Sequence, residues 1–583
     1  MTDGVLNSRL VEPAQAAPNE SAPLATPALL SPVARTAWAA LIAATLAICY
    51  FSHLGALGFV GPDEPRYAWI ARDMAESDDW VTPRLYGTPW FEKPPLYYWC
   101  AALSFKLFGV SETAARLPSA IAALLATLAI AWLAWRLYGA ETARRLLLLL
   151  PTSVGMIGFS HAAATDMPFA ATLTLALVSA CVTLGLVPGW PTASAAAPTS
   201  LTPACLLFGF FLGLAVLAKG PAAIVLFGGA VFFWALFAKR WCDAFRLFHP
   251  AALVAFCLTA LPWYILCARR NPDFLRVFII EHNFKRYLTP EFQHIQPFWF
   301  YGVVLLVAFL PWTALFLWSG VSGAIHLWCT RRISDATLLL LCWSAFCLLF
   351  FTISKSKLPG YVLPAIPAIT LLMTQRSRAL ESARSKAVSL SVLVAALLLG
   401  PGYVFMVLLT RHMRGPNYFA GIAAGWILAA LLTANLLLGV GIWLASKGQA
   451  GATLAAGAVL PILIAALFAN RLIPAFSIVE ASGKTVAEEL LRTNIPSDDL
   501  AVRNMSRAKR YSLSFYVRRE IPEWNSEQAP KGYLLLRGEF CERIVGKNYT
   551  CEQVPFDWST ARYFLYRVRP RSVGVASGGG EVK

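Results

Sequence analysis

The chain has 583 residues, 57% of them hydrophobic and only 14% charged, and it carries a net charge of +17. A soluble protein of this length would carry roughly 25% charged residues, so the composition indicates that lipid surrounds most of the chain. We expect no nucleic-acid partner, because no soluble basic domain precedes or interrupts the apolar segments. The positive charge fits basic cytoplasmic loops and anionic lipid head groups or, alternatively, an anionic substrate.

The N-terminal region, residues 1–35, is rich in Ala, Pro and Ser, which predicts a disordered cytoplasmic tail. A first apolar run follows that is too long, and too far from the start, for a cleaved signal peptide. The twenty-residue rule for crossing hydrocarbon predicts about thirteen spans in all, of which 142–159 and 203–218 are short enough to be re-entrant. The predicted spans are 36–59, 115–137, 142–159, 166–187, 203–218, 221–238, 250–267, 297–320, 333–351, 358–374, 386–409, 419–445 and 450–471.

Basic residues of the short loops predict the orientation of these spans. They fall in alternate loops, which the positive-inside rule places in the cytoplasm: Arg144, Arg145, Lys239, Arg240, Arg331, Arg332, Arg376, Arg378 and Lys447. The long loops 60–115 and 268–296, and the chain after Arg471, then face the periplasm.

The C-terminal region, residues 476–583, alternates short apolar runs with charged turns, which predicts a small α/β domain. Its expected strands are Leu513–Val517, Tyr533–Leu536 and Tyr563–Tyr566. If this domain is periplasmic, Cys541 and Cys551 could form a disulfide there.

Acidic residues on the predicted outer side are the first candidates for chemistry. Asp63 and Glu64 follow the first span directly, and Asp166 opens the fourth span. Carboxylates are costly to desolvate at the mouth of a membrane cavity, so they need partners or a purpose. The alternative is that Asp63 and Asp166 only begin the helices that follow them.

Cations gather on the same predicted side of the membrane. Lys93 follows Glu92 and precedes two prolines among aromatic residues, a pattern that suits a lipid phosphate or a sugar ring, or else an interfacial anchor. The other basic residues lie in three further outer loops: Lys219, Lys285, Arg286, Lys355 and Lys357. Carboxylates and cations on one face suit a reaction in which a phosphate leaves.

These motifs occur in the order found in the GT-C class of glycosyltransferases, which includes the protein O-mannosyltransferases. More narrowly, the chain resembles the bacterial lipid A 4-amino-4-deoxy-L-arabinose transferase family. The resemblance covers the membrane region and the C-terminal region, and it rests on the segments DEPRY (63–67), EKPP (92–95), TDMP (165–168), KGP (219–221) and SKSKLPGY (354–361).

The resemblance implies a fold of about thirteen transmembrane helices over residues 36–475, with a periplasmic α/β domain over 476–583. It implies an inverting transfer of aminoarabinose from undecaprenyl phosphate to lipid A phosphates at the periplasmic face of the inner membrane, by a monomer that requires no cofactor. Asp63, Glu64 and Asp166 would be catalytic. The donor phosphate would be bound by Lys93, Arg286, Lys219, Lys355 and Tyr361, and the sugar or acceptor by Tyr67, Glu92, Tyr97 and Lys357.

Other functions stay open at this point. A sister transferase would move galacturonic acid or mannose from the same type of carrier to a glycolipid or a protein. A flippase is less consistent with the sequence, which lacks paired internal repeats. The chain has no Walker A or Rossmann glycine motif, so an ATP-driven mechanism lacks its usual phosphate cradle. A divalent cation held by Glu92 and His282 also remains open.

Overall fold

A computed structural model describes residues 32–188, 202–285, 295–376 and 482–571, apart from short gaps at 332, 494, 526, 538–540, 547 and 556–562. Several predictions fall outside the described residues: the N-terminal tail up to residue 31, Arg286, and the spans 386–409, 419–445 and 450–471.

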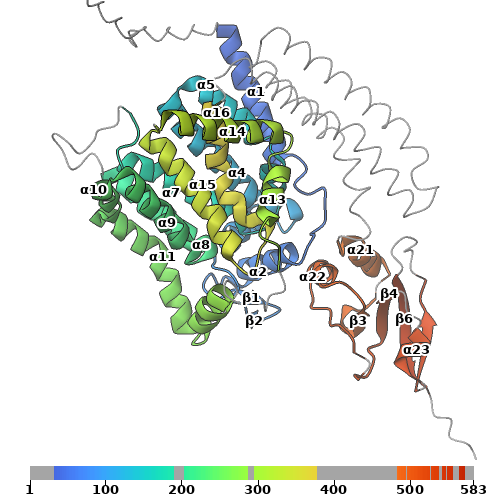
Figure 1. Ribbon diagram of the computed structural model, residues 1–583. Coiled ribbons are helices and arrows are strands. Elements are labelled where there is room, and N and C mark those ends of the chain that lie inside the picture. The colour runs from blue at the N-terminus through green and yellow to red at the C-terminus, as the bar shows by residue number, and fades with distance from the viewer. Residues whose placement is uncertain are drawn as a thin grey trace, which may run out of the picture.

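The membrane part is a bundle of helices (Figure 1). Its helices are α1 (Pro32–Phe51), α4 (Glu112–Tyr138), α5 (Ala140–Leu149), α6 (Val154–Ser160), α7 (Asp166–Thr183), α8 (Thr202–Lys219), α9 (Ala222–Ala238), α10 (Trp241–Ala244), η2 (Phe245–Phe248), α11 (Pro250–Arg270), η3 (Arg276–Lys285), α13 (Phe300–Ala308), α14 (Thr313–Thr330), α15 (Asp335–Ile353), η4 (Pro359–Ala365) and α16 (Ile366–Arg376). Among the described residues, α4, α7, α8, α11 and α15 are each long and apolar enough to cross a membrane.

Three predicted spans are not single helices, and one of them, 358–374, falls into the 3₁₀ helix η4 and the α-helix α16. Residues 142–159 fall into α5 and α6, which are separated at Pro151-Thr152-Ser153. Residues 297–320 fall into α13 and α14, whose axes differ by 118° at the break that contains Pro311. Proline lacks the N–H that continues a helix, so the break occurs where an apolar run alone predicts continuity. The short span 203–218, in contrast, is one helix, α8.

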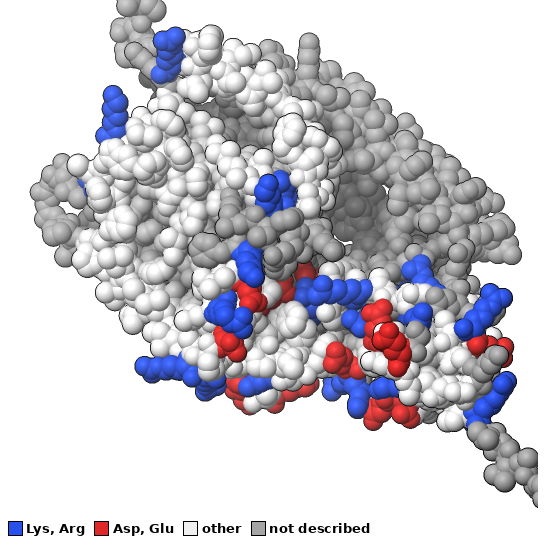
Figure 2. Space-filling view, turned by 60° about the horizontal axis from the view of Figure 1, so that its bottom comes forward, with Lys and Arg blue, Asp and Glu red and all other residues white. Residues whose placement is uncertain are grey.

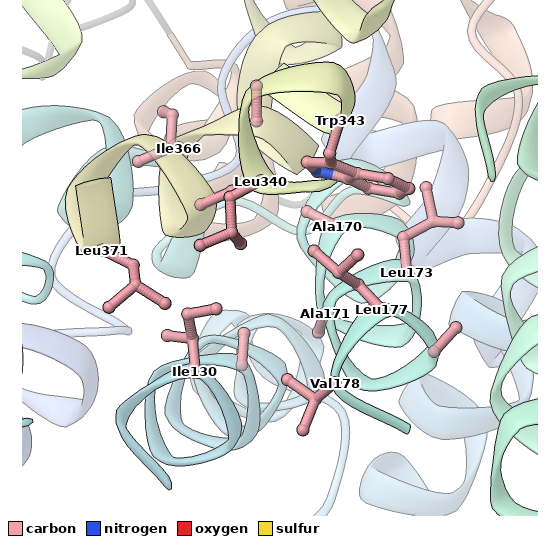
Figure 3. Packing of buried hydrophobic residues seen from close by; sticks show 14 of the residues in the cluster. Ile130, Ala170, Ala171, Leu173, Leu177, Val178, Leu340, Trp343, Ile366 and Leu371 are labelled. Carbon is pink, nitrogen blue, oxygen red and sulfur yellow. The ribbon is translucent and has the colours of Figure 1, made fainter. Parts of the chain in front are cut away.

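The core of the bundle lies where α4, α7, α15 and α16 meet. Figure 3 shows core residues of all four helices, among them Ile130 of α4, Ala171 of α7, Leu340 of α15 and Leu371 of α16. The Trp343 ring packs in the same core, and its Nε1 donates to the Pro364 carbonyl at 2.8 Å. This packing fixes η4 and the N-terminal end of α7 relative to each other.

The first loop folds into a compact cap of α2 (Asp63–Ser77), β1 (Arg84–Leu85), β2 (Thr88–Pro89) and α3 (Leu96–Phe108) at one end of the bundle (Figure 1). Asp63 and Glu64 occupy the first turn of α2, where negative charge favours a helix. Strands β1 and β2 pair antiparallel around Tyr86 and Gly87, both of which have positive φ, 54° and 82°. Two such residues make the two-residue turn that suits a tight hairpin.

The C-terminal domain has a four-stranded sheet in the order β3-β4-β6-β5, in which only β3 and β4 are parallel. Its elements are α21 (Lys484–Arg492), η5 (Ser497–Asp499), β3 (Leu500–Arg503), α22 (Arg507–Tyr516), β4 (Tyr533–Arg537), α23 (Cys541–Val545), β5 (Tyr549–Gln553) and β6 (Tyr563–Pro570). Cys541 and Cys551 form a disulfide between α23 and β5.

One strand expected in this domain is wrong. Leu513–Val517 largely belongs to the helix α22, whereas the other two predicted strands correspond to β4 and β6. The Ser506 side chain accepts from the Lys509 amide and caps α22. The inner face of this helix packs against the sheet, and Leu513 is fully buried. A five-residue apolar run cannot by itself separate a buried helix face from a strand.

The C-terminal domain docks on the cap through α22. Tyr516 donates from its hydroxyl to Glu112 at 2.8 Å and accepts from the Phe59 amide at 2.9 Å. Ser512 donates to the Phe59 carbonyl at 3.0 Å, and Lys484 lies 2.8 Å from the Glu112 carboxylate. These contacts hold residues far apart in the sequence against the start of the first loop.

Candidate functional site

A chain of charged side chains runs through the cap. Arg66 forms ion pairs with Asp63 and, at 2.8 Å, with Glu92, and Glu92 lies 3.8 Å from the Lys93 ammonium. The sequence places Asp63 and Lys93 in separate motifs, and Arg66 joins the two. Asp63 is the most accessible member, with its side chain 46% exposed against 6% for Arg66, 9% for Glu92 and 13% for Lys93. We call these four residues the cap network.

Aromatic rings surround the centre of the cap network. The Arg66 guanidinium lies 5.7 Å from the Trp90 ring and 5.5 Å from the ring of Tyr511, which comes from α22 of the C-terminal domain. Burial by itself lowers the pKa of Arg66, but the charges of Glu92 and Asp63 outweigh burial and hold the pKa above its usual value. Arg66 therefore stays charged and fixes the direction of both carboxylates.

Glu64 belongs to a different, fully buried cluster. Its carboxylate accepts from the amides of Val60 and Ala163 and from Nε and Nη2 of Arg116, at 2.8–3.1 Å. Arg116 spends its remaining donors on the carbonyls of residues 54, 57 and 58. Four accepted hydrogen bonds occupy the lone pairs of the carboxylate, so the geometry favours a positioning role for Glu64 over the predicted catalytic one.

A second ion pair lies where α7, α8 and η4 meet. Lys219 at the end of α8 lies 2.5 Å from Asp166 at the start of α7, and its ammonium faces the Tyr361 ring at 4.6 Å. Gly360 is needed beside them, because a Cβ at this position would meet the Asp166 carboxylate at 2.8 Å. Three motifs that are distant in the sequence thus form one cluster.

Apolar packing brings the segment before Lys93 to the same end of α8. Phe91 shares an apolar cluster with Leu217 of α8 and with Trp263, Phe274 and Phe278 from α11 and the second loop. Figure 2 shows the charged side chains gathered in the lower part of the view, whereas most of the remaining described surface is uncharged.

Two loops that the positive-inside rule assigns to the other side of the membrane also contact each other. Arg240 follows α9 and lies 2.7 Å from Asp335 at the start of α15. Both were predicted to face the cytoplasm.

The remaining predicted ligands are placed less favourably. Tyr67 and Tyr97 are buried, and the Tyr97 hydroxyl donates to the Ala115 carbonyl at 2.8 Å, which favours packing over sugar binding. Lys357 is buried and donates to the Ser354 carbonyl at 2.8 Å. Lys355 is exposed. Arg286 lies outside the described residues.

The possible metal site has too few ligands in the described part of the chain. Glu92 already accepts from Arg66, and no group of three or more His, Cys, Asp and Glu side chains able to hold a metal is found among the described residues. His282 lines a cavity of about 480 Å³ together with Arg270, Arg276 and Asp273. Glu92 and His282 therefore lack, among the described residues, the third ligand that a metal centre needs.

Comparison with known proteins places this chain in a family. Residues 36–278 match the model of the dolichyl-phosphate-mannose-protein mannosyltransferases. The undecaprenyl phosphate-alpha-4-amino-4-deoxy-L-arabinose arabinosyl transferase of Erwinia tasmaniensis is 31% identical over 440 residues, covering 73% of this chain and 77% of the relative. The protein of the same name from Serratia proteamaculans is 32% identical over 412 residues, covering 68% and 71%. The chain belongs to this arabinosyl transferase family.

The fold of the chain agrees with that of a protein whose structure is known. The crystal structure of ArnT from Cupriavidus metallidurans bound to undecaprenyl phosphate matches with a TM-score of 0.72 and 23% identity, covering 92% of this chain and 99% of that chain. The same protein in the apo state gives 0.70. The chain thus has the mostly helical fold of that protein, with several candidate membrane spans among the described residues.

For this arabinosyl transferase, sequence reasoning missed three residues of the site. Arg66 lies within the segment 63–67, and an Arg three positions after an acid on a helix is a recognisable pairing signal. Arg116 carried a signal as well, because a charge at the start of an apolar span needs a partner. Tyr511 had none, since nothing local to α22 indicates that it docks over residue 66.

Proposed function

We propose that the protein transfers 4-amino-4-deoxy-L-arabinose from undecaprenyl phosphate to phosphate groups of lipid A at the periplasmic face of the inner membrane. The names of its relatives support the donor and the sugar. The observation that carries the proposal is the cap network, in which Arg66 links the accessible Asp63 to Glu92 and Lys93 at the rim of the bundle.

The reaction is a single inverting displacement. An oxygen of the acceptor phosphate attacks the anomeric carbon, the bond from that carbon to the carrier phosphate oxygen breaks, and the electron pair leaves with undecaprenyl phosphate. Negative charge therefore grows on the leaving phosphate. Lys93 is placed to meet this charge, with Lys219 and Arg286 as further candidates, because fixed cations in a site poor in water stabilise it strongly.

The acceptor is already ionised, so this transfer needs no general base. The Asp63 carboxylate is the accessible end of the cap network, and Arg66 holds it in place. It is suited to pair with the ammonium of aminoarabinose or to orient the sugar for attack. Asp166 is tied to Lys219 at 2.5 Å, so its part is to position that cation.

We propose that the cap and the C-terminal domain lie in the periplasm. Disulfides persist in oxidising compartments, and the Cys541–Cys551 bond lies in the domain that docks on the cap. The ion pair between Arg240 and Asp335 puts two predicted cytoplasmic loops together at the other end. We also propose that the protein has about thirteen membrane helices and acts as a monomer.

Mass spectrometry of lipid A from matched cells with and without the protein tests the function. We expect a mass increase of one aminoarabinose on a lipid A phosphate that depends on the protein. A galacturonic acid or mannose product on lipid A, a glycolipid or a protein would instead identify a sister transferase. Unchanged glycosylation together with altered lipid distribution would point to a flippase.

Replacing Lys93 by Ala should chiefly weaken donor binding. A charged hydrogen bond to phosphate contributes about 1.5–3 kcal/mol, so we expect the donor KM to rise about tenfold or more. The measurement is the initial rate against donor concentration at saturating lipid A. Lys106→Ala is the matched control, because Lys106 pairs with Asp78 outside the cap network. Donor affinity unchanged in Lys93→Ala would contradict the assigned role.

A further inference from the structure

A small cavity lies between the hairpin of the first loop and helix α22. Its volume is about 270 Å³, and the residues that face it include Tyr86, Thr88, Trp90, Arg510, Tyr511 and Glu520. Small-molecule sites usually span about 300–1,000 Å³, so this cavity is sized for about one sugar unit. About half of the residues that line it belong to the C-terminal domain. The reaction proposed above assigns no role to that domain.

The walls of the cavity are fixed in place. Tyr86 has a φ of 54°, which a non-glycine residue adopts only where the surrounding structure holds it. Its ring contacts Trp69 at a centroid distance of 4.6 Å and Tyr511 at 6.3 Å. On the other side, the Ser514 hydroxyl accepts from the Ile521 amide at 3.1 Å and holds the chain after α22.

The cavity adjoins the cap network. Trp90 and Tyr511 line it, and both rings also contact the Arg66 guanidinium, at 5.7 and 5.5 Å. A molecule in the cavity is therefore one side chain away from the residues that meet the sugar and the leaving phosphate. It approaches from the side of the C-terminal domain, whereas Lys93 lies at the far end of the network.

The walls of the cavity suit a saccharide, and Arg510 is the side chain among them that can pair with an anionic group on it. Tyr86, Trp90 and Tyr511 present aromatic faces and edges, which suit the apolar face of a sugar ring. Arg510, which lies 3.4 Å from the Glu523 carboxylate, supplies a cation, and Glu520 and Thr88 supply acceptors for hydroxyl groups. Burial raises the pKa of the Tyr86 hydroxyl, which stays a donor at neutral pH.

We infer that this cavity binds a phosphorylated sugar unit of the acceptor lipid and that the C-terminal domain thereby completes the acceptor site. This inference rests on the proposed function, because it assigns the second substrate of that reaction. It explains why α22 docks on the cap through Tyr511, Ser512 and Tyr516. A lipid chain is a poor fit, since charged and hydroxyl groups line the cavity beside the rings.

The test uses the full-length protein and two kinds of variant. Arg510→Ala removes the cation, and Thr88→Trp fills the cavity from an exposed position on β2. Arg519→Ala is the matched control, because Arg519 is an ion-paired arginine of the same domain, like Arg510, but does not line the cavity. Initial rates are measured with lipid A varied at saturating donor and with donor varied at saturating lipid A. Equilibrium binding of the deacylated glucosamine disaccharide bisphosphate headgroup is measured by calorimetry, with thermal unfolding as a check on folding.

We expect Arg510→Ala and Thr88→Trp to raise the lipid A KM about tenfold while the donor KM stays within about twofold, and the control to change neither. Both variants should also lose headgroup binding. The inference is overturned if folded variants keep the wild-type lipid A KM and headgroup affinity, or if the donor KM rises instead. If wild-type protein binds the headgroup through this cavity but transfers no sugar to lipid A, the proposed function fails while the binding site stands.

Discussion

Asp63→Asn is expected to lower the rate of sugar transfer about 10²–10³-fold, the usual loss when one preorganised charged group is removed from a transition state. The substitution keeps the shape of the side chain and removes only its charge. Arg66 keeps its 2.8 Å ion pair with Glu92, so the cap network and the fold should survive. Binding of undecaprenyl phosphate should stay close to that of the wild type, because Lys93 is unchanged. Single-turnover transfer and carrier binding are the two measurements.

Asp78→Asn is the control for this variant. Asp78 ends α2 with a φ of 56°, which Asn tolerates, and it pairs with Lys106 at an exposed position. We expect transfer by Asp78→Asn to stay within about twofold of the wild type, because exposed ion pairs contribute little. Full transfer by Asp63→Asn would remove Asp63 from the mechanism. Loss of carrier binding together with transfer would instead assign Asp63 to donor binding.

Hydropathy predicts which segments form the long membrane helices, but it does not predict where a helix is interrupted. Five predicted spans are long apolar helices, because a helix is the only way an isolated apolar segment satisfies its backbone in lipid. The same rule is blind to a bend inside the protein, where other elements take up the freed groups. At the break between α13 and α14, the Leu310 carbonyl accepts from the Val154 amide at 2.9 Å. That bond joins residues far apart in the sequence, so no local pattern predicts it.

The candidate site was predictable as a set of motifs but not as a network. Charges that are costly in a membrane protein marked Asp63, Lys93, Asp166 and Lys219, and the structure joins them in two clusters. The sequence did not show that the adjacent residues Asp63 and Glu64 have different roles. Asp63 is half exposed, whereas Glu64 points inward to Arg116, because successive residues of a helix face different directions. That difference now separates a candidate for chemistry from a structural carboxylate.

Arg116→Met should destabilise the protein more than any other substitution considered for the cap. Arg116 and Glu64 are 3% and 8% exposed and lie 2.8 Å apart. Removing one partner of a buried pair leaves the other charge uncompensated, which costs about 3–5 kcal/mol. The carbonyls of residues 54, 57 and 58 also lose their donor, and these carbonyls lead into α2. We expect a large fall in the Tm of the detergent-purified protein, with the cap opening before the bundle.

Arg136→Met provides the comparison on the same helix, because Arg136 lies at the opposite end of α4, where it donates to the Pro188 carbonyl and contacts the Trp135 ring. Its Tm should stay near that of the wild type. Adding Glu64→Gln to Arg116→Met removes the stranded charge, so the double variant should recover part of the lost Tm. A double variant as unstable as Arg116→Met alone would show that the carbonyl contacts, and not the buried charge, dominate. Hydrogen exchange at residues 54–64 would then be equally fast in both variants. That result would contradict the positioning role assigned to Glu64.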